Sequence, residues 1–484
     1  MKKFIALFFL ISGFALFPLC GCAGKKQSRT LYVIRAAFNG ENTVTASMEV
    51  DYFNDTETEI KYLCFNLFAN AYREGAEHFP CSPADFARAY PNGLNYGGIV
   101  IESCSESGEE SDWEIVGDDL NILVLRLKKG VFPSERAKVE IVFTVTVPDC
   151  RLRMGVTGGP VNLGNWFPVL CARYEGGFYE CTYYPLGDPF FSETADYKVS
   201  FEVPGSYTVA SSGRCVSTEI GENTTVYYYE LYGARDFAAV LCPDFCVEKT
   251  SACGVEISLY HVNCAFSSEI LTAAAKALEL FSELFGKYPY ETFSVAVTEF
   301  IQGGMEYPSL VYVSSFLEKE EAVAAAVHET AHQWWYAAVG NNQAETAYLD
   351  EGLAEYSTLL FYENYPAYGL TREGIVKEKT SEFRAFYGVF EQITGTVNAI
   401  MERNLAEFNG EPEYVEICYV RSALMFDGLR ESIGDKKFFA GLKTFYSENE
   451  FGVAGTDELI SSFVRGGFDV ESYIRSWLTG RAII

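Results

Sequence analysis

Histidine is scarce in this 484-residue chain, which has only four: His78, His261, His328 and His332. A multi-histidine metal store is therefore excluded, and any histidine-based metal site must use these positions. Basic residues are also few beside acidic ones, 37 against 66, which gives a formal charge of −29. Because the phosphates of nucleic acids would repel so acidic a chain, we expect no DNA or RNA partner.

Closely spaced cysteine pairs of the CxxC type are absent, so a cysteine-based zinc site is not supported. Of the 14 cysteines, 14 − 2 = 12 follow residue 22. Outside the cytoplasm some could form disulfides, for example Cys171–Cys181 or Cys242–Cys246. Otherwise they are small buried hydrophobic residues, and the sequence leaves the two alternatives open.

The N-terminal segment resembles an export signal, because two lysines precede an apolar run. The run is short for a membrane span and contains Pro18. It ends in Leu-Cys-Gly-Cys, which resembles a bacterial lipobox with Cys22 as the lipidated residue. The resemblance predicts a lipoprotein signal peptide over 1–22, a polar tether over 23–30, and an extracytoplasmic protein that its lipid anchors to the cell membrane. Plain secretion and an uncleaved anchor are the alternatives.

The rest of the chain consists of two segments that differ in the spacing of their apolar residues. Residues 31–260 are rich in segments that alternate apolar and polar side chains, which predicts strands. In one of these segments the apolar face carries Val139, Ile141, Phe143, Val145 and Val147. Residues 261–484 mainly show helical spacing, with a short strand block at 292–313. We therefore expect an antiparallel β-domain followed by a mainly helical domain, in line with roughly 100–200 residues per domain.

A metal-binding motif lies in the second part, where residues 328–332 read His-Glu-Thr-Ala-His. At about 3.6 residues per turn, His328 and His332 share one face of a helix and can bind one metal ion, for which tetrahedral zinc is well suited. Glu329 lies about 100° around the helix, where it can contact a metal-bound water without binding the metal. The pattern predicts a hydrolytic metal site.

The helix with this motif is predicted to start with a capping box of Ser315 and Glu318 and to extend to Gly340. A second helix then presents Glu351, which eighteen intervening residues separate from His332. Two histidines, one glutamate and an open fourth position describe a catalytic site for one zinc ion per chain.

Three motifs in this order resemble the M1 family of zinc aminopeptidases, the gluzincins. The first is Gly-Gly-Met-Glu-Tyr at 303–307, similar to the family's G-A-M-E-N element. The second is H-E-x-x-H, followed after eighteen residues by Glu in Leu-Asp-Glu-Gly-Leu-Ala-Glu-Tyr. The third is Cys-Tyr-Val-Arg-Ser-Ala at 418–423, similar to Y-x-K-G-A. The resemblance implies a saddle-like antiparallel β-sheet domain and a thermolysin-like, mainly helical zinc metallopeptidase domain.

The resemblance also implies roles for individual residues. Zinc would be bound by His328, His332 and Glu351. Glu329 would be the general base, and Tyr419 would donate a hydrogen bond to the oxyanion. Glu306 would pair with the free α-amine of a peptide substrate. The backbone of the segment Gly303, Gly304 and Met305 would bind the peptide as an added strand.

Some positions leave alternatives open. Tyr307 replaces the asparagine of the family motif, and Glu355, one turn beyond Glu351, either orients a histidine or is solvated. Only 484 − 419 = 65 residues follow Tyr419, which predicts an open cleft.

From the motifs and the resemblance we expect an aminopeptidase acting on peptides. A zinc endopeptidase with an open cleft and a non-catalytic surface scaffold on the same fold are the alternatives.

Overall fold

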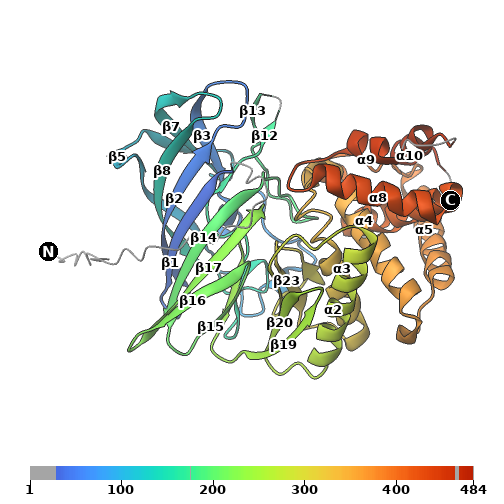
Figure 1. The fold of residues 1–484 in the computed structure, drawn as a ribbon, viewed down its shortest axis with the longest axis horizontal. Helices are drawn as coiled ribbons and strands as arrows, with labels where there is room; N and C mark the ends of the chain where they lie inside the picture. Colours follow the sequence, from blue (N-terminus) through green and yellow to red (C-terminus); the bar gives the residue numbers. More distant parts are fainter. Residues whose placement is uncertain (1–28, 175, 464–467, 483–484) are drawn as a thin grey trace.

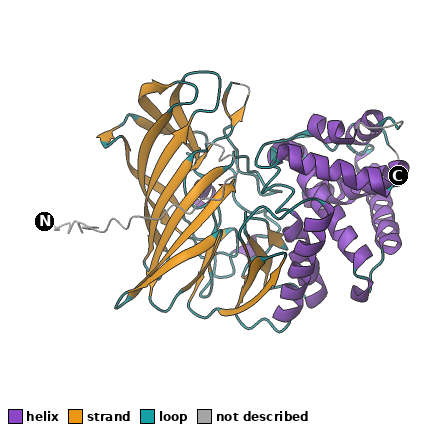
Figure 2. Cartoon of the chain, viewed as in Figure 1, coloured by secondary structure: helices purple, strands orange, loops and turns teal. Residues whose placement is uncertain are grey.

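The computed structural model describes residues 29–174, 176–463 and 468–482. A strand-rich part, residues 31–242, and a helix-rich part, residues 246–482, lie side by side (Figure 1, Figure 2). The predicted signal peptide and Cys22 fall outside the described residues. Within the described ranges, no helix is both long and apolar enough to cross a membrane.

An eight-stranded sheet forms one side of the strand-rich part, in the order β16-β17-β14-β1-β2-β8-β4-β5 (Figure 1). Its strands are β1 Leu31–Phe38, β2 Thr43–Phe53, β4 Gly98–Glu106, β5 Glu109–Glu110, β8 Arg136–Thr146, β14 Ala195–Pro204, β16 Arg214–Ile220 and β17 Thr224–Ala234. Alternate residues of β8 face the core, and Ile141, Phe143 and Val145 are fully buried, as the period of two predicts. The pairing of β1 with β14 is parallel, and the other pairings in this sheet are antiparallel.

Smaller sheets complete the strand-rich part, and the indole of Trp166 lies in its core. One has the order β15-β18-β10-β9 and another the order β11-β3-β7-β6. The elements are β3 Ile60–Asn66, η1 Phe68–Tyr72, α1 Phe86–Ala89, β6 Trp113–Val116, β7 Ile122–Val131, β9 Met154–Val156, β10 Val161–Leu163, β11 Val169–Leu170, β12 Arg173–Tyr174, β13 Gly177–Phe178, β15 Thr208–Ser211 and β18 Ala239–Cys242. Trp166 contacts the rings of Phe143 and Phe201 from the large sheet, which joins the layers through apolar packing.

A five-stranded sheet opens the helix-rich part, in the order β19-β20-β21-β23-β22. Its strands are β19 Cys246–Ala252, β20 Val255–His261, β21 Thr292–Thr298, β22 Gly304–Met305 and β23 Leu310–Ser314. Strands β19 and β20 lie, except for His261, within the segment up to residue 260 that the sequence predicts to be strand-rich. Strand β20 pairs in parallel with β21, a contact between distant segments that local periodicity does not report.

Helices are the other regular elements of the described residues (Figure 2). They are α2 Ser267–Leu284, α3 Lys319–Ala331, α4 Gln343–Asn364, η2 Pro366–Tyr368, α5 Arg372–Thr394, η3 Leu405–Glu407, α6 Glu411–Tyr414, η4 Val415–Arg421, α7 Ser422–Ile433, α8 Asp435–Asn449, α9 Thr456–Phe463 and α10 Val470–Leu478. Element η4 is a π-helix, a conformation that is rare and concentrated at functional sites.

Helix α3 starts later than predicted. Its first residue is Lys319, and its capping box pairs Glu318 with Glu321, so the prediction of a start at Ser315 was wrong. Ser315 belongs to the preceding turn because its N–H donates to the carbonyl of Thr298, 2.9 Å away. That hydrogen bond extends the contact between β21 and β23 by one residue.

The same helix ends at Ala331 rather than at Gly340, so His332 is its C-cap. Tyr336 has a φ of 121°, a left-handed value that turns the chain away from the helix axis. Arg235 of the strand-rich part holds this turn, because its Nε donates to the Tyr336 carbonyl at 2.8 Å. An added Cβ at Gly340 would lie 2.0 Å from the Arg235 Cζ. Tertiary contacts therefore override the helix propensity of the alanine-rich stretch.

Candidate metal centre and active site

The three predicted metal ligands converge between α3 and α4. The Nε2 atoms of His328 and His332 lie 3.1 Å apart, and each is 3.3 Å from one carboxylate oxygen of Glu351. Two imidazole nitrogens and a carboxylate oxygen this close together fit the ligand set of one zinc ion, with a fourth position left open.

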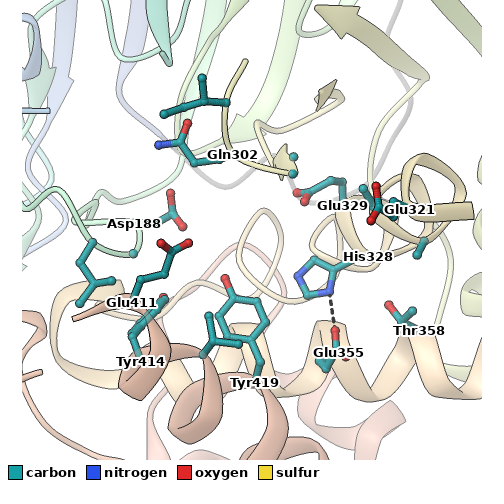
Figure 3. Close-up of a pocket in the computed structure, with 18 of the residues that line it drawn as sticks. Asp188, Gln302, Glu321, His328, Glu329, Glu355, Thr358, Glu411, Tyr414 and Tyr419 are labelled. Atoms are coloured by element: carbon teal, nitrogen blue, oxygen red, sulfur yellow. Dashed lines mark hydrogen bonds and ion pairs between the residues drawn. The ribbon is translucent and has the colours of Figure 1, made fainter. Parts of the chain in front are cut away.

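Both histidines are oriented by a hydrogen bond from their other ring nitrogen. His332 Nδ1 donates to the carbonyl of Trp335 at 2.9 Å, and His328 Nδ1 donates to Glu355 at 3.2 Å (Figure 3). Lys379 on α5 donates to the second oxygen of Glu355. With Nδ1 protonated, both Nε2 lone pairs are free for a metal ion. Glu355 therefore orients a histidine and is not simply solvated.

Charge within this cluster shifts the pKa values of its members. Burial acts to raise the pKa of Glu351, but hydrogen bonds to His328 and His332 lower it to about 2. Burial acts to lower the pKa of His328, but hydrogen bonds to Glu351 and Glu355 raise it to about 9. A bound cation must displace these protons, so metal binding releases protons and weakens as the pH falls.

Glu329 points into the cavity beside the ligands (Figure 3). It is 6% exposed, and its Oε2 has no hydrogen-bond partner among the described residues. Burial raises its pKa to about 7. Gly304 gives it room, because an added Cβ there would lie 2.3 Å from Glu329 Oε1. A carboxyl with a pKa near neutrality can both take up and release a proton at physiological pH.

The segment predicted to bind the peptide lies at the edge of the five-stranded sheet, where β22 runs antiparallel to β23. Gly303 and Gly304 line the cavity, whereas Met305 is buried behind it. Tyr307, which differs from the family motif, is fully buried, and its hydroxyl donates to Asn165 at 3.1 Å. This difference therefore lies away from the cavity and connects the two parts of the molecule.

Glu306 lies beside the metal ligands and is 3% exposed. One of its carboxylate oxygens lies within 4.8 Å of a His332 ring nitrogen. Its Oε1 accepts a hydrogen bond from Gln343 Nε2 at 2.8 Å, and the same Nε2 donates to Asp350 at 2.7 Å. Burial and the nearby Asp188 carboxylate raise the pKa of Glu306 well above its usual range. A cationic group brought next to Glu306 would reverse this shift.

Tyr419 belongs to the π-helix η4, and its ring lies against the ring of His328. The two rings are stacked, with centroids 5.7 Å apart and an angle of 12°. Tyr414 packs edge-on against Tyr419, with a centroid distance of 5.7 Å. Helices α4 and α7 approach so closely here that an added Cβ at Gly352 would lie 2.4 Å from the Ser422 Cβ. The glycine that follows Glu351 therefore brings the ligand helix and the tyrosine together.

A cavity of about 1390 Å³ opens over these groups. Its walls are α3, α4, α5 and α6, the glycines of the 303–304 edge, and the 184–188 turn of the strand-rich part. Figure 3 shows Asp188 and Gln302 across the cavity from His328. The volume exceeds the roughly 300–1,000 Å³ of ordinary small-ligand sites, so a peptide of several residues can enter.

Sequence reasoning missed several residues that shape the site. Gln343 holds Glu306, Lys379 holds Glu355, and Asp188 forms a buried ion pair with Arg153. These contacts join residues 24 to 37 positions apart in the sequence, so no local pattern marks them. For Asp188 the only available signal was the resemblance of the surrounding Tyr-Pro-Leu-Gly-Asp-Pro run to the family's first domain.

The twelve cysteines that the structure describes are all free. Neither suggested pair, Cys171–Cys181 or Cys242–Cys246, forms a disulfide. Burial raises the pKa of Cys171 well above its usual range, so this thiol stays protonated and unreactive. Most of the cysteines are therefore packing residues in this fold.

Hydrolysis at a single metal ion needs an open coordination position and a carboxylate that can take a proton from water. The cluster of His328, His332 and Glu351 would leave such a position on a bound metal ion, and Glu329 supplies the carboxylate next to a cavity large enough for a peptide, as in a single-metal peptidase. Residues 270–477 match the peptidase family M1 domain. Residues 270–477 therefore carry a peptidase family M1 domain, in agreement with the family predicted from the motifs.

Similar proteins agree with this assignment. Aminopeptidase N of Lactobacillus helveticus is 23% identical over 413 residues, which cover 80% of this chain and 46% of that protein. Aminopeptidase M1-A of Oryza sativa subsp. japonica is 24% identical over 303 residues, covering 58% of this chain and 34% of that protein. The chain thus spans about half the length, or less, of these relatives.

Solved structures show the same fold over almost the whole chain. The M1 zinc metallopeptidase of Deinococcus radiodurans has a TM-score of 0.67 at 16% identity, covering 95% of this chain and 96% of that chain. A mutant of the same enzyme bound to a Tyr-Ser-Ala substrate has a TM-score of 0.66 at 17% identity, with the same coverage. A strand-rich domain followed by a mainly helical metallopeptidase domain is therefore the fold of this chain.

Proposed function

We propose that this protein is a zinc-dependent aminopeptidase that releases N-terminal residues from peptides. The observation that carries the proposal is the convergence of His328, His332 and Glu351 beside Glu329, whose Oε2 has no partner among the described residues. A zinc ion held by the three ligands would lower the pKa of a water molecule and polarise the scissile carbonyl.

Glu329 acts as the proton carrier. The residue lines the cavity, and its Oε2 has no hydrogen-bond partner among the described residues, so it is free to accept a proton from the attacking water. Because burial places its pKa at about 7, the same carboxyl can pass that proton to the amine that leaves.

Tyr419 stabilises the carbonyl oxygen as it gains negative charge. Its ring is held against His328, and the residue lines the cavity. Burial raises the pKa of its hydroxyl well above the usual range, so the hydroxyl keeps its proton and remains a hydrogen-bond donor.

Glu306 selects the free amine of the substrate. A protonated α-amine beside this buried carboxylate would form a charge-assisted hydrogen bond and lower the raised pKa of Glu306. The edge formed by Gly303 and Gly304 would bind the first residues of the peptide as an added strand. Cleavage would then occur one residue from the N-terminus.

A panel of peptides with free and acetylated N-termini tests the proposal. The purified protein should cleave only the free forms, and a zinc chelator should abolish the cleavage. Glu329→Gln should retain zinc and lose activity by orders of magnitude, because only the proton carrier is removed. Glu283→Gln, an exposed carboxylate of α2, is the matched control. Undiminished turnover by Glu329→Gln would refute the mechanism.

The size of the cavity also favours a second candidate, an endopeptidase that admits internal segments of a chain. In that case acetylated peptides would be cleaved as fast as free ones. Glu306→Ala would then leave turnover almost intact, whereas for an aminopeptidase it should raise KM for free peptides and relax the requirement for a free amine.

We also propose that the protein is a lipoprotein anchored outside the cytoplasm through Cys22. The support is the order of the N-terminal segment: two lysines, an apolar run and Leu-Cys-Gly-Cys. Mass spectrometry of the membrane-extracted protein should find an N-terminal diacylglyceryl cysteine. Cys22→Ser should move the protein from the membrane fraction to the soluble one, and a membrane-bound Cys22→Ser variant would contradict the proposal.

A further inference from the structure

The cavity carries an excess of negative charge. Each of the four lysine and arginine side chains that line it is ion-paired with a carboxylate, as Arg88 is with Asp85 and Lys319 with Glu320. Other lining carboxylates, among them Glu411, form no ion pair with a described lysine or arginine. A charged group that enters the cavity therefore meets uncompensated carboxylates.

One of these carboxylates shares a short helix with a buried hydroxyl that has no partner among the described residues. Glu411 and Tyr414 are the first and last residues of α6, and both point into the cavity together with Asp188 (Figure 3). Tyr414 is 3% exposed, and its hydroxyl has no hydrogen-bond partner among the described residues. An added Cβ at Gly187 would lie 2.8 Å from this hydroxyl, so the oxygen lies against the 187–188 turn. Buried polar atoms without a partner are rare, and this one belongs to a residue that lines the cavity.

This place adjoins the reaction centre. The Tyr414 ring contacts the ring of Tyr419, which is itself stacked on the metal ligand His328, with both centroid distances at 5.7 Å. One aromatic ring therefore separates the Tyr414 side chain from the site of bond cleavage. A side chain of the residue on either side of the scissile bond can reach across that distance.

We propose that Glu411 and the Tyr414 hydroxyl bind the cationic side chain of a substrate residue next to the scissile bond, so that the enzyme prefers lysine and arginine there. Ammonium and guanidinium groups are donors only, and a carboxylate with a neighbouring hydroxyl oxygen accepts from them. The inference rests on the proposed peptidase function and adds a substrate class to it.

Matched peptides test the preference. Lys-Ala-Ala is compared with norleucyl-Ala-Ala, and Ala-Lys-Ala with Ala-norleucyl-Ala, since norleucine keeps the carbon chain of lysine without its charge. At low ionic strength the lysine peptide of one pair should have a kcat/KM roughly 10-fold higher than its partner. The ratio should fall in about 0.5 M salt, because salt screens the attraction. The pair that shows the preference identifies the substrate position.

Two variants assign the preference to the residues. Glu411→Gln should bring the lysine-to-norleucine ratio close to one, while Glu222→Gln, an exposed residue remote from the cavity, should keep it. Tyr414→Phe removes no hydrogen bond found among the described residues, so the thermal stability of the variant should be retained while the ratio falls.

The outcomes separate this inference from the proposed function. If peptides are cleaved with ratios near one in both pairs, or if Glu411→Gln keeps the wild-type ratio, the inference is overturned and the peptidase function stands. If no peptide is cleaved, the proposed function fails. In that case calorimetry measures the dissociation constants of the same peptide pairs. Equal affinities for the lysine and norleucine peptides overturn the inference as well.

Discussion

Replacing Glu355 with glutamine should weaken zinc binding without unfolding the protein. The carboxylate accepts from His328 Nδ1 at 3.2 Å and from the ammonium of Lys379. The side chains of Glu355, His328 and Lys379 are only 12% to 20% exposed, so water screens these contacts weakly. Glutamine keeps the shape and one acceptor oxygen but removes the negative charge that increases the basicity of His328.

The expected loss is about 10- to 100-fold in zinc affinity, which is the usual effect of removing a carboxylate that orients a metal-bound histidine. At about 1.4 kcal/mol per tenfold change, this equals roughly 1.4 to 2.8 kcal/mol. Lys379 loses its ion pair with residue 355 in the variant, which adds a separate cost to folding. The double variant Glu355→Gln with Lys379→Met removes that cost and should keep the weakened zinc affinity.

Zinc affinity is measured by competition with a chromophoric chelator at fixed pH. Urea unfolding of the metal-free protein is measured in parallel, so that a change in fold stability is not mistaken for a change in the metal site. Glu391→Gln, an exposed carboxylate on α5, is the matched control and should bind zinc as the wild type does. An unchanged affinity in Glu355→Gln would refute the role assigned to this carboxylate.

Three further predictions concern the site and the fold. Gly352→Ala should lower the free energy of unfolding by about 1–3 kcal/mol, because the new Cβ meets Ser422, and Ser422→Gly should restore part of it in urea unfolding. Tyr419→Phe should lower kcat by about 10²–10³ in steady-state peptide assays while zinc content is retained. Burial raises the pKa of Asp236 to about 7, so the folded chain holds a proton that the unfolded chain releases near pH 4. The contribution of the protonated Asp236 carboxyl to the free energy of unfolding is complete below about pH 4. It is lost between about pH 4 and 7. Asp236→Asn should therefore flatten the fall of unfolding free energy over that range.

The sequence by itself determined that two histidines share one helix face and that the strands alternate. His328 and His332 are one helical turn apart along the chain, so local geometry brings their side chains to one face. The alternating residues of β8 are buried as the period of two predicts, because a pleated strand sends successive side chains to opposite faces. Such predictions succeed where the chemistry depends on neighbours in sequence.

Only the tertiary structure decided where helix α3 ends and what surrounds its histidines. Arg235, about a hundred residues away in sequence, captures the Tyr336 carbonyl and turns the chain after Ala331. Glu355 and its partner Lys379 are brought to His328 by the packing of α4 and α5. Such contacts depend on how distant segments pack, and hydrophobic period and helix propensity carry no information about that packing.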